Sequence, residues 1–230
     1  MIKRAKWGSG RVKIEWSSKF AYAIGLIATD GCLYNDERHI SLTTKDIQQA
    51  RNFKKCLEIS VKIGLKSSGS VKEKIYHHVQ FGDVVFYKFL YSIGITSAKS
   101  KTIGKIEIPD KYFFDFLRGC FDGDGTFYSY WDPRWRSSHM FYLEFISASK
   151  NHINWLRAEL KRKLDVFGHI TKDSKGATYQ LKYAKKEALE IIKKMYYNRH
   201  AICLSRKRIK IEKALAIEKK QQKEYKNARV

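Results

Sequence analysis

The chain of 230 residues carries 46 Lys and Arg against 23 Asp and Glu, a formal net charge of +23, and 43% of its residues are hydrophobic. That apolar content is enough for one large or two small domains, and with only two prolines and fourteen glycines the composition excludes a collagenous or wholly disordered chain. Such a charge indicates a polyanionic partner. Nucleic acid is the first candidate, because Lys and Arg that neutralise phosphates release condensed counterions.

The sequence shows no sign of a membrane or secreted protein. The longest apolar run, residues 20–28, is far shorter than the roughly 20 residues that a membrane helix needs. Residues 1–17 form a basic N-terminal arm without the apolar core of a signal peptide. The four cysteines lie far apart, as is typical of reduced packing residues. We therefore expect an intracellular protein without a membrane partner or small-molecule substrate, and leave open whether it works in a bacterial or archaeal cytoplasm or in an organelle.

An internal repeat begins in two apolar segments, residues 20–31 and 114–125, each predicted to be a buried helix. Gly25 stands five residues before Asp30, and Gly119 five residues before Asp124, so both features recur 94 residues later. Each segment ends in a glycine that can terminate a helix in the left-handed conformation. An aspartate at this negative end of a helix gains nothing from the helix dipole, so a bound cation explains it best.

The same elements are predicted after each of these helices. Strands at 39–43 and 142–147 lead into helices near 47–61 and 153–164, hairpins near 70–81 and 169–183, further helices at 83–93 and 186–197, and basic strings at 97–101 and 204–208. Aligning Lys45 with Lys150 predicts about eleven extra residues in the second copy, within 128–139. Each copy is thus helix, two strands, helix, two strands, helix.

Two related halves suggest an intramolecular dimer with approximate two-fold symmetry. Gly25 and Gly119 would let the two helix backbones approach closely, which brings Asp30 and Asp124 side by side. Two carboxylates at that distance cannot both stay ionised without a cation between them. Mg2+ takes oxygen ligands, keeps several waters and suits phosphate-ester chemistry.

At this point the two motifs are recognisable. Residues 23–31, Ala-Ile-Gly-Leu-Ile-Ala-Thr-Asp-Gly, and 117–125, Leu-Arg-Gly-Cys-Phe-Asp-Gly-Asp-Gly, resemble the two nine-residue signatures of single-chain LAGLIDADG homing endonucleases, over roughly residues 18–210. The resemblance implies an α+β fold of two pseudo-symmetric αββαββα repeats, whose antiparallel saddle-shaped sheets pack through the two motif helices. We expect an arm at 1–17, repeats at 18–104 and 105–207, and a basic C-terminal helix at 208–230. The sixth motif position departs from the pattern in the first copy, which has Ala28 where the second has Asp122.

The resemblance also implies an activity: hydrolysis of both DNA strands at a long site, in the service of intron homing, with Mg2+ as cofactor. Mn2+ is expected to substitute, and Ca2+ to bind without supporting cleavage. The implied metal ligands are the carboxylates of Asp30 and Asp124 with the main-chain carbonyls of Thr29 and Gly123. The implied catalytic residues are the two aspartates with Thr44, Ser149, Lys99 and Lys207.

Plainer interpretations of these residues stay open. Thr44 and Ser149 would order water near the metal, but each is equally suited to N-cap a helix. Lys99 and Lys207 would lie near the scissile phosphate, but a solvated basic face is the alternative. Lys101 and Arg206 are neighbours that could serve instead.

Further residues are predicted to contact DNA. They are Lys45, Lys150, Trp131, Arg134, Trp135, Arg136, Lys72, Lys74, Lys172 and Lys182. The aromatic residues could instead form a hydrophobic hairpin tip, and the C-terminal helix is either a packed helix or a phosphate-contacting arm. Because the halves differ, we expect a monomer that cuts an asymmetric double-stranded site. Two other functions stay open: an RNA maturase that assists splicing of intron RNA, and a non-cleaving DNA-binding regulator.

Overall fold

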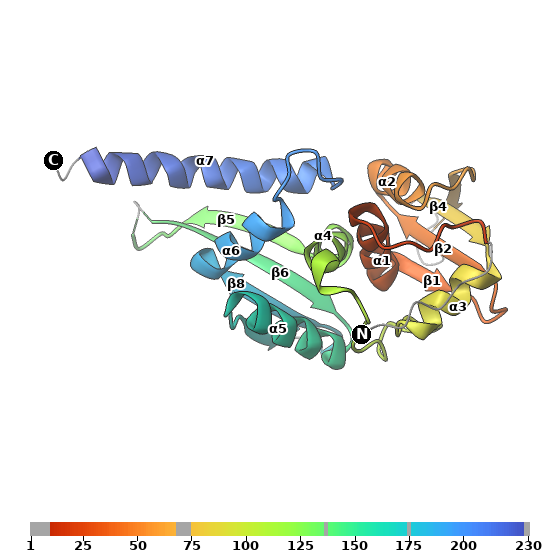
Figure 1. The fold of residues 1–230 in the computed structure, drawn as a ribbon. Coiled ribbons are helices and arrows are strands. Elements are labelled where there is room, and N and C mark those ends of the chain that lie inside the picture. The colour runs from red at the N-terminus through yellow and green to blue at the C-terminus, as the bar shows by residue number, and fades with distance from the viewer. Residues whose placement is uncertain (1–9, 68–74, 136–137, 174–175, 228–230) are drawn as a thin grey trace.

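The computed structural model describes residues 10–67, 75–135, 138–173 and 176–227, with side chains to residue 221. Two copies of one αββαββα unit follow each other along the chain (Figure 1). The first consists of α1 (Ser18–Asp30), β1 (Gly31–Leu33), β2 (His39–Thr44), α2 (Ile47–Leu57), β3 (Gly64–Ser67), β4 (Ile75–Gly82) and α3 (Val84–Ser92). The second consists of α4 (Phe113–Asp124), β5 (Thr126–Trp131), β6 (His139–Ser147), α5 (Lys150–Leu164), β7 (His169–Lys172), β8 (Tyr179–Ala184) and α6 (Lys185–Met195), preceded by a 3-10 turn (Asp110–Tyr112) and followed by α7 (Ser205–Asn227).

Each unit contains one four-stranded antiparallel sheet, in the order β1-β2-β4-β3 or β5-β6-β8-β7. One face of each sheet is apolar and covered by helices; Leu42 and Val79 on the first sheet and Leu143 and Leu181 on the second are fully buried. The alternation of buried and open positions is that of strands with one packed face. The predicted α+β fold of two repeats is therefore confirmed.

The seam between the two units is the contact of α1 with α4, which lie side by side in the middle of the molecule (Figure 1). A Cβ on Gly25 would lie 2.2 Å from the carbonyl oxygen of Phe116, and one on Gly119 would lie 2.2 Å from that of Tyr22. No side chain fits at either position, so the backbones touch directly, as the sequence predicted.

The glycines that end the motif helices differ from expectation. Gly31 and Gly125 are extended, with φ of −78° and −75°, and not left-handed. Their requirement is space, because a Cβ at either position would lie 2.5 to 2.7 Å from atoms of Ile27 or Phe121 in the preceding turn. The chain thus leaves each helix directly into the first strand of its sheet.

The strand ladders correct the alignment of the two copies. Cys32 pairs with Ser41, and its counterpart Thr126 pairs with Glu144, so the offset grows from 94 to 103 residues across the hairpin. The second hairpin is therefore nine residues longer, not eleven. The N-caps of α2 and α5, Asp46 and Ser149, are also 103 residues apart.

Helix α7 follows the second unit and runs beside β5 (Figure 1). It begins at Ser205, three residues before the expected start of the C-terminal helix, and packs through Ile211 and Ala214, which are buried. Within the residues that the structure describes, no helix is long and apolar enough to span a bilayer.

Candidate functional site

Asp30 and Asp124 are the last residues of α1 and α4, so the seam that joins the helices also joins the carboxylates. The approach is closest beside them: a Cβ on Gly123 would lie 2.0 Å from Oγ1 of Thr29 and 3.3 Å from Oδ2 of Asp30. The four groups predicted to hold a metal, at Thr29, Asp30, Gly123 and Asp124, are thus gathered at one end of the helix pair.

The electrostatics of this cluster disfavour two free charges. Burial raises the pKa of Asp30 to about 6, and the charge of Asp124 adds to the shift. Asp124 is more open to solvent, yet the protein atoms around it also raise its pKa. Part of each carboxylate's charge is offset by Lys99 and Lys207. Keeping both carboxylates ionised in the folded protein therefore costs free energy, and a bound cation would reduce that cost.

Gln49, a residue that the sequence analysis did not select, connects Asp30 to Thr44. Its Nε2 donates to Oδ2 of Asp30 at 2.6 Å, and its Oε1 accepts a hydrogen bond from Thr44 Oγ1 at 2.8 Å. Gln49 is buried and stands on the same face of α2 as Phe53 and Cys56. In the sequence, a glutamine at a core-facing position of an otherwise apolar helix face was the signal that could have identified it. Gln49 therefore links the hydroxyl of Thr44 to the carboxylate of Asp30 by two hydrogen bonds.

Thr44 and Ser149 are not equivalent. Thr44 corresponds to Ser147, since each hydroxyl accepts a hydrogen bond at 3.1 Å from the amide two residues later, that of Asp46 or of Ser149. Ser149 is the N-cap of α5, and its hydroxyl also donates to the carbonyl of Ile103 at 2.5 Å. The N-cap interpretation is therefore confirmed for Ser149 and wrong for Thr44, because Asp46 caps α2. That either hydroxyl orders water near a metal stays a prediction.

Lys99 and Lys207 both reach the ends of the motif helices. Nζ of Lys99 donates to the carbonyl of Gly31 at 2.5 Å and lies 3.4 Å from that of Thr29. Nζ of Lys207 contacts the carbonyls of Phe121 (2.5 Å), Gly125 (2.6 Å), Asp122 (2.9 Å) and Gly123 (3.3 Å).

The two lysines are buried, 6% and 7% exposed, so the alternative of a solvated basic face is wrong. Burial lowers the pKa of both, that of Lys207 to about 8. Among the neighbours considered for these positions, Lys101 is exposed and Arg206 pairs with Asp46 at 2.9 Å. Lys99 and Lys207 are therefore the cations of this site.

The donor set fits a hard divalent cation. Two carboxylates stand beside the carbonyls of Thr29 and Gly123, whose lysine contacts, at 3.4 and 3.3 Å, are long enough to leave acceptor capacity. In the described residues no cluster of three or more His, Cys, Asp or Glu is found. An ion here would complete its shell with water and phosphate oxygens, which suits Mg2+.

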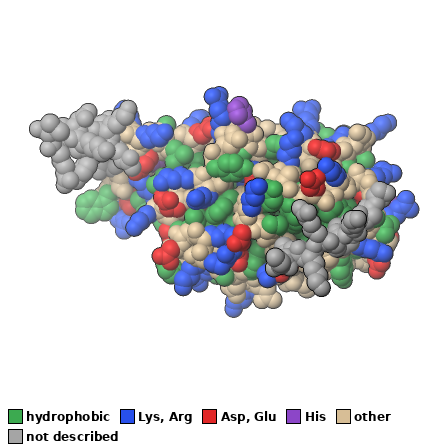
Figure 2. Space-filling view, viewed as in Figure 1, with side chains coloured by type: hydrophobic (Ala, Val, Ile, Leu, Met, Phe, Trp, Pro, Cys, Tyr) green, Lys and Arg blue, Asp and Glu red, His purple; other side chains and the backbone are tan. Residues whose placement is uncertain are grey.

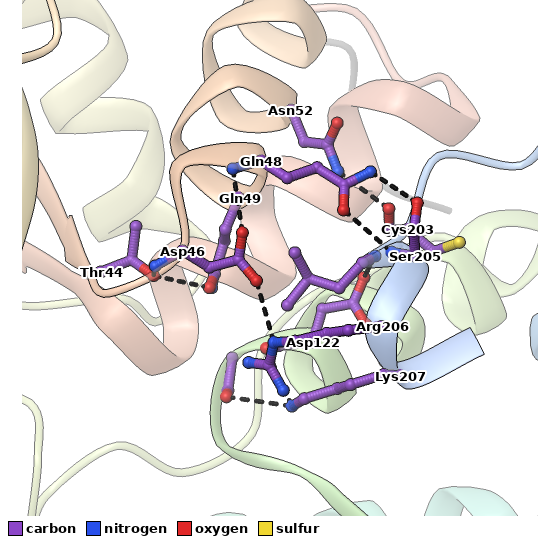
Figure 3. Close-up of polar contacts among 12 residues, drawn as sticks. Thr44, Asp46, Gln48, Gln49, Asn52, Asp122, Cys203, Ser205, Arg206 and Lys207 are labelled. Carbon is purple, nitrogen blue, oxygen red and sulfur yellow. Dashed lines mark hydrogen bonds and ion pairs between the residues drawn. The ribbon is translucent and has the colours of Figure 1, made fainter. Parts of the chain in front are cut away.

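A second set of contacts between the units joins α2 to the start of α7 (Figure 3). Gln48 forms two hydrogen bonds with Ser205, Nε2 to Oγ at 2.8 Å and the Ser205 amide to Oε1 at 3.0 Å. Nδ2 of Asn52 donates to the carbonyl of Cys203 at 3.0 Å. These contacts, with the Asp46 to Arg206 ion pair, hold the start of α7 against the first unit.

The predicted DNA contacts fall into three groups. Lys45, Lys150 and Lys172 are exposed, as are the rings of Trp131 and Trp135 at 49% and 70%. Two others are paired with acids: Arg134 with Asp132 and Lys182 with Glu144, each at 3.1 Å. Lys72, Lys74 and Arg136 lie outside the described residues. Trp135 is thus open to solvent, whereas the half-exposed ring of Trp131 packs on that of His139 at 5.0 Å between centroids.

The surface charge is spread broadly. Figure 2 shows Lys and Arg side chains scattered over the visible face, with Asp and Glu side chains among them. Along the second sheet the face opposite the helices carries a ladder of tyrosines: Tyr142 stacks with Tyr128 at 5.4 Å and with Tyr130 at 6.3 Å between ring centroids.

No protein-family model and no curated protein matches the chain by sequence. By structure it is similar to I-SmaMI bound to uncleaveable DNA (TM-score 0.59, 14% identity, covering 92% of each chain). It is also similar to I-WcaI bound to its DNA recognition sequence (0.57, 14%, 85% of this chain and 88% of that one). A third is full-length DUF199/WhiA from Thermatoga maritima (0.53, 18%, 90% and 70%).

These likenesses establish the fold. The chain has the two-repeat LAGLIDADG fold seen in single-chain homing endonucleases, which confirms the resemblance inferred from its two motifs. The same fold occurs in the N-terminal LAGLIDADG domain of DUF199/WhiA.

Proposed function

We propose that the chain is a site-specific endonuclease that hydrolyses both strands of duplex DNA with divalent metal ions. The observation that carries the proposal is the pairing of Asp30 and Asp124 at the end of two backbone-to-backbone helices, with a buried lysine beside each. Solved proteins of the same fold, I-SmaMI and I-WcaI, are described as a meganuclease and a homing endonuclease bound to DNA.

The residues have separable tasks in this proposal. Asp30 and Asp124, with the carbonyls of Thr29 and Gly123, would hold the metal ions, and Gln49 orients Asp30. When bound, Mg2+ supplies polarisation of the phosphate and a lowered pKa for bound water. Lys99 and Lys207 keep positive charge close to the carboxylates, where a phosphodiester would be attracted.

The halves would contact different sequences. The second hairpin is nine residues longer and carries Trp131 and Trp135, and the tyrosine ladder belongs to the second sheet. We therefore propose that the recognised site is asymmetric and that a monomer cuts both strands. Intron homing, the use of Mn2+ in place of Mg2+ and the inability of Ca2+ to support cleavage belong to the same proposal.

The test is to incubate the protein in Mg2+ with a randomised duplex library, or with source DNA that lacks its own gene, and to sequence the ends. Unique ends are expected from the wild type and none from Asp124→Asn, which should still bind the selected sequence, as the wild type should in Ca2+. Asp165→Asn is the matched control, because this exposed residue at the end of α5 has a left-handed backbone that asparagine tolerates. Cleavage by Asp124→Asn at the wild-type rate would overturn the site assignment.

A non-cleaving DNA-binding protein is the second candidate. It is favoured by the likeness to DUF199/WhiA, which covers 90% of this chain. Retention of one duplex sequence without cut ends would support it. An RNA maturase stays a prediction from the sequence, and selective retention of intron RNA, with no cut or retained duplex, is the outcome that favours it.

A further inference from the structure

Helix α4 carries two buried polar side chains, one turn apart, that form hydrogen bonds to the backbone of the segment leading into α7. Arg118 donates from Nη1 to the carbonyl of Met195 at 2.6 Å and from Nε to that of Ile202 at 2.9 Å. Oδ2 of Asp122 accepts from the amide of Leu204 and from the hydroxyl of Tyr22, each at 2.7 Å. Asp122 thus links α1, α4 and the start of α7 through one oxygen atom.

The segment that Asp122 holds delivers Lys207 to the site. The carbonyl of Leu204 accepts from the amides of Lys207 and Arg208, so Leu204 opens the first turn of α7. A carboxylate at this end of a helix interacts favourably with its dipole. Three residues later, Nζ of Lys207 lies against the carbonyls of Phe121 and Gly125. The Asp122 hydrogen bond therefore fixes where the Lys207 ammonium lies.

Among the described residues of the first half, no buried Arg and Asp pair holds the segment that carries Lys99. Ile24 and Ala28 occupy the positions of Arg118 and Asp122, 94 residues earlier. The segment after Lys99 is held from the other side, by Ser149 on the carbonyl of Ile103 and by His152 on that of Gly104 at 2.9 Å. The two lysines are thus placed by different means.

The burial of Asp122 is unfavourable if its role is only to fill space. It is fully buried, and its Oδ1 has no hydrogen-bond partner among the described residues. An unpaired buried carboxylate oxygen destabilises a fold, and the equivalent position of α1 is occupied by an alanine, Ala28. A specific task at this position accounts for its presence.

We propose that Asp122, supported by Tyr22, is a positioning residue for Lys207, so that it governs cleavage of one DNA strand and not of the other. The inference rests on the proposed endonuclease function. Loss of the hydrogen bond to Leu204 lets the first turn of α7 shift and withdraws the ammonium from the Asp124 end of the site. The Lys99 side keeps its own supports and is unaffected.

The experiment follows the two strands separately, on a duplex labelled differently at each end, with Asp122→Ala, Asp122→Asn and Tyr22→Phe. We expect Asp122→Ala to slow one strand about tenfold relative to the other, so that nicked DNA accumulates. Asp122→Asn keeps an acceptor oxygen and should recover part of the rate, and Tyr22→Phe should give a smaller effect on the same strand. Tyr183→Phe removes another buried tyrosine hydroxyl, one without a hydrogen-bond partner in the described residues, and should change neither strand.

Amide hydrogen exchange on the same intact variants is a second readout that needs no cleavage. Asp122→Ala should speed exchange at Leu204 and in the first turn of α7, while residues 97–103 keep their protection. Equal slowing of both strands, or unchanged exchange at Leu204, would overturn the positioning role. Failure of the wild type to cut either strand would instead overturn the proposed function, and the exchange result would still decide the role of Asp122.

Discussion

Asp30 lowers the stability of the folded protein at the pH where its carboxylate is ionised. Its pKa in the folded chain is about 6, against about 3.9 for an unperturbed aspartate, so folding favours its neutral form. The stabilising contribution is complete below pH 4 and is lost as the pH rises through 6. At pH 7 to 8, the folded protein therefore carries an unfavourable charge at this position.

Replacing Asp30 by Asn should remove that cost. Without divalent ions at pH 8, we expect Asp30→Asn to raise the free energy of unfolding by about 1–3 kcal/mol, and to leave it nearly unchanged at pH 4. Chemical denaturation at the two pH values, in the presence of a chelator, measures the difference. Asp165→Asn serves as the control, and a loss of stability at pH 8 would contradict the account of Asp30.

Gln49 should matter for cleavage more than for binding. Gln49→Leu leaves Asp30 without its 2.6 Å hydrogen bond and Thr44 without an acceptor, so we expect cleavage to slow about ten- to a hundredfold while the Kd for DNA stays close to the wild-type value. Single-turnover cleavage and equilibrium binding measure the two quantities. Asp165→Asn, at the exposed end of α5, is the control. A Gln49→Leu variant that cleaves at the wild-type rate would contradict the role of Gln49 in orienting Asp30.

Among single residues, the sequence could predict those that stand at fixed positions in the two repeated helices. Asp30 and Asp124 could be found because each ends a recognisable apolar helix. Gln49 could not be selected as a partner of Asp30, because a contact between α2 and the end of α1 depends on how the helix packs. The task of Asp122 was missed for a similar reason: its partners Tyr22 and Leu204 are 100 and 82 residues away in the chain.

The helix pair is the element on which the rest depends. Gly25→Ala would force a Cβ to within 2.2 Å of a backbone carbonyl that has no freedom to turn away. Overpacking of a core usually costs 1–3 kcal/mol, and we expect a loss of about 3 kcal/mol or more here because backbone must move. The matched control is Gly64→Ala, because a Cβ on Gly64 would have its nearest atom at 3.7 Å, an ordinary contact distance. Thermal unfolding of the two variants measures their difference in stability. Equal stability of the two variants would refute direct backbone contact at the seam.

The order and type of the elements could be predicted, but the register between the copies could not. A hydroxyl residue followed by Lys occurs at the end of β2 and at the start of α5, and aligning Lys45 with Lys150 gave an offset two residues too large. The correct offset depends on which residues pair across the strands, as Cys32 does with Ser41. One sequence does not contain that information, because a polar hairpin tolerates several lengths.

For the whole molecule the net charge of +23 determines how DNA would be held. We expect the logarithm of the Kd for duplex DNA to rise linearly with the logarithm of the salt concentration, with a slope set by the number of phosphates contacted. Asp124→Asn should share this slope, because it leaves the distributed lysines and arginines in place. Fluorescence anisotropy over a salt series measures it, and a flat response would contradict a phosphate-based interface.

The bare seam between α1 and α4 also bears on how such a molecule could change over time. Because Gly25 and Gly119 meet backbone to backbone, the spacing of the two helices does not depend on the size of any side chain at that point. Each sheet can therefore acquire new surface residues, and the second hairpin new length, without altering the distance between the two aspartates.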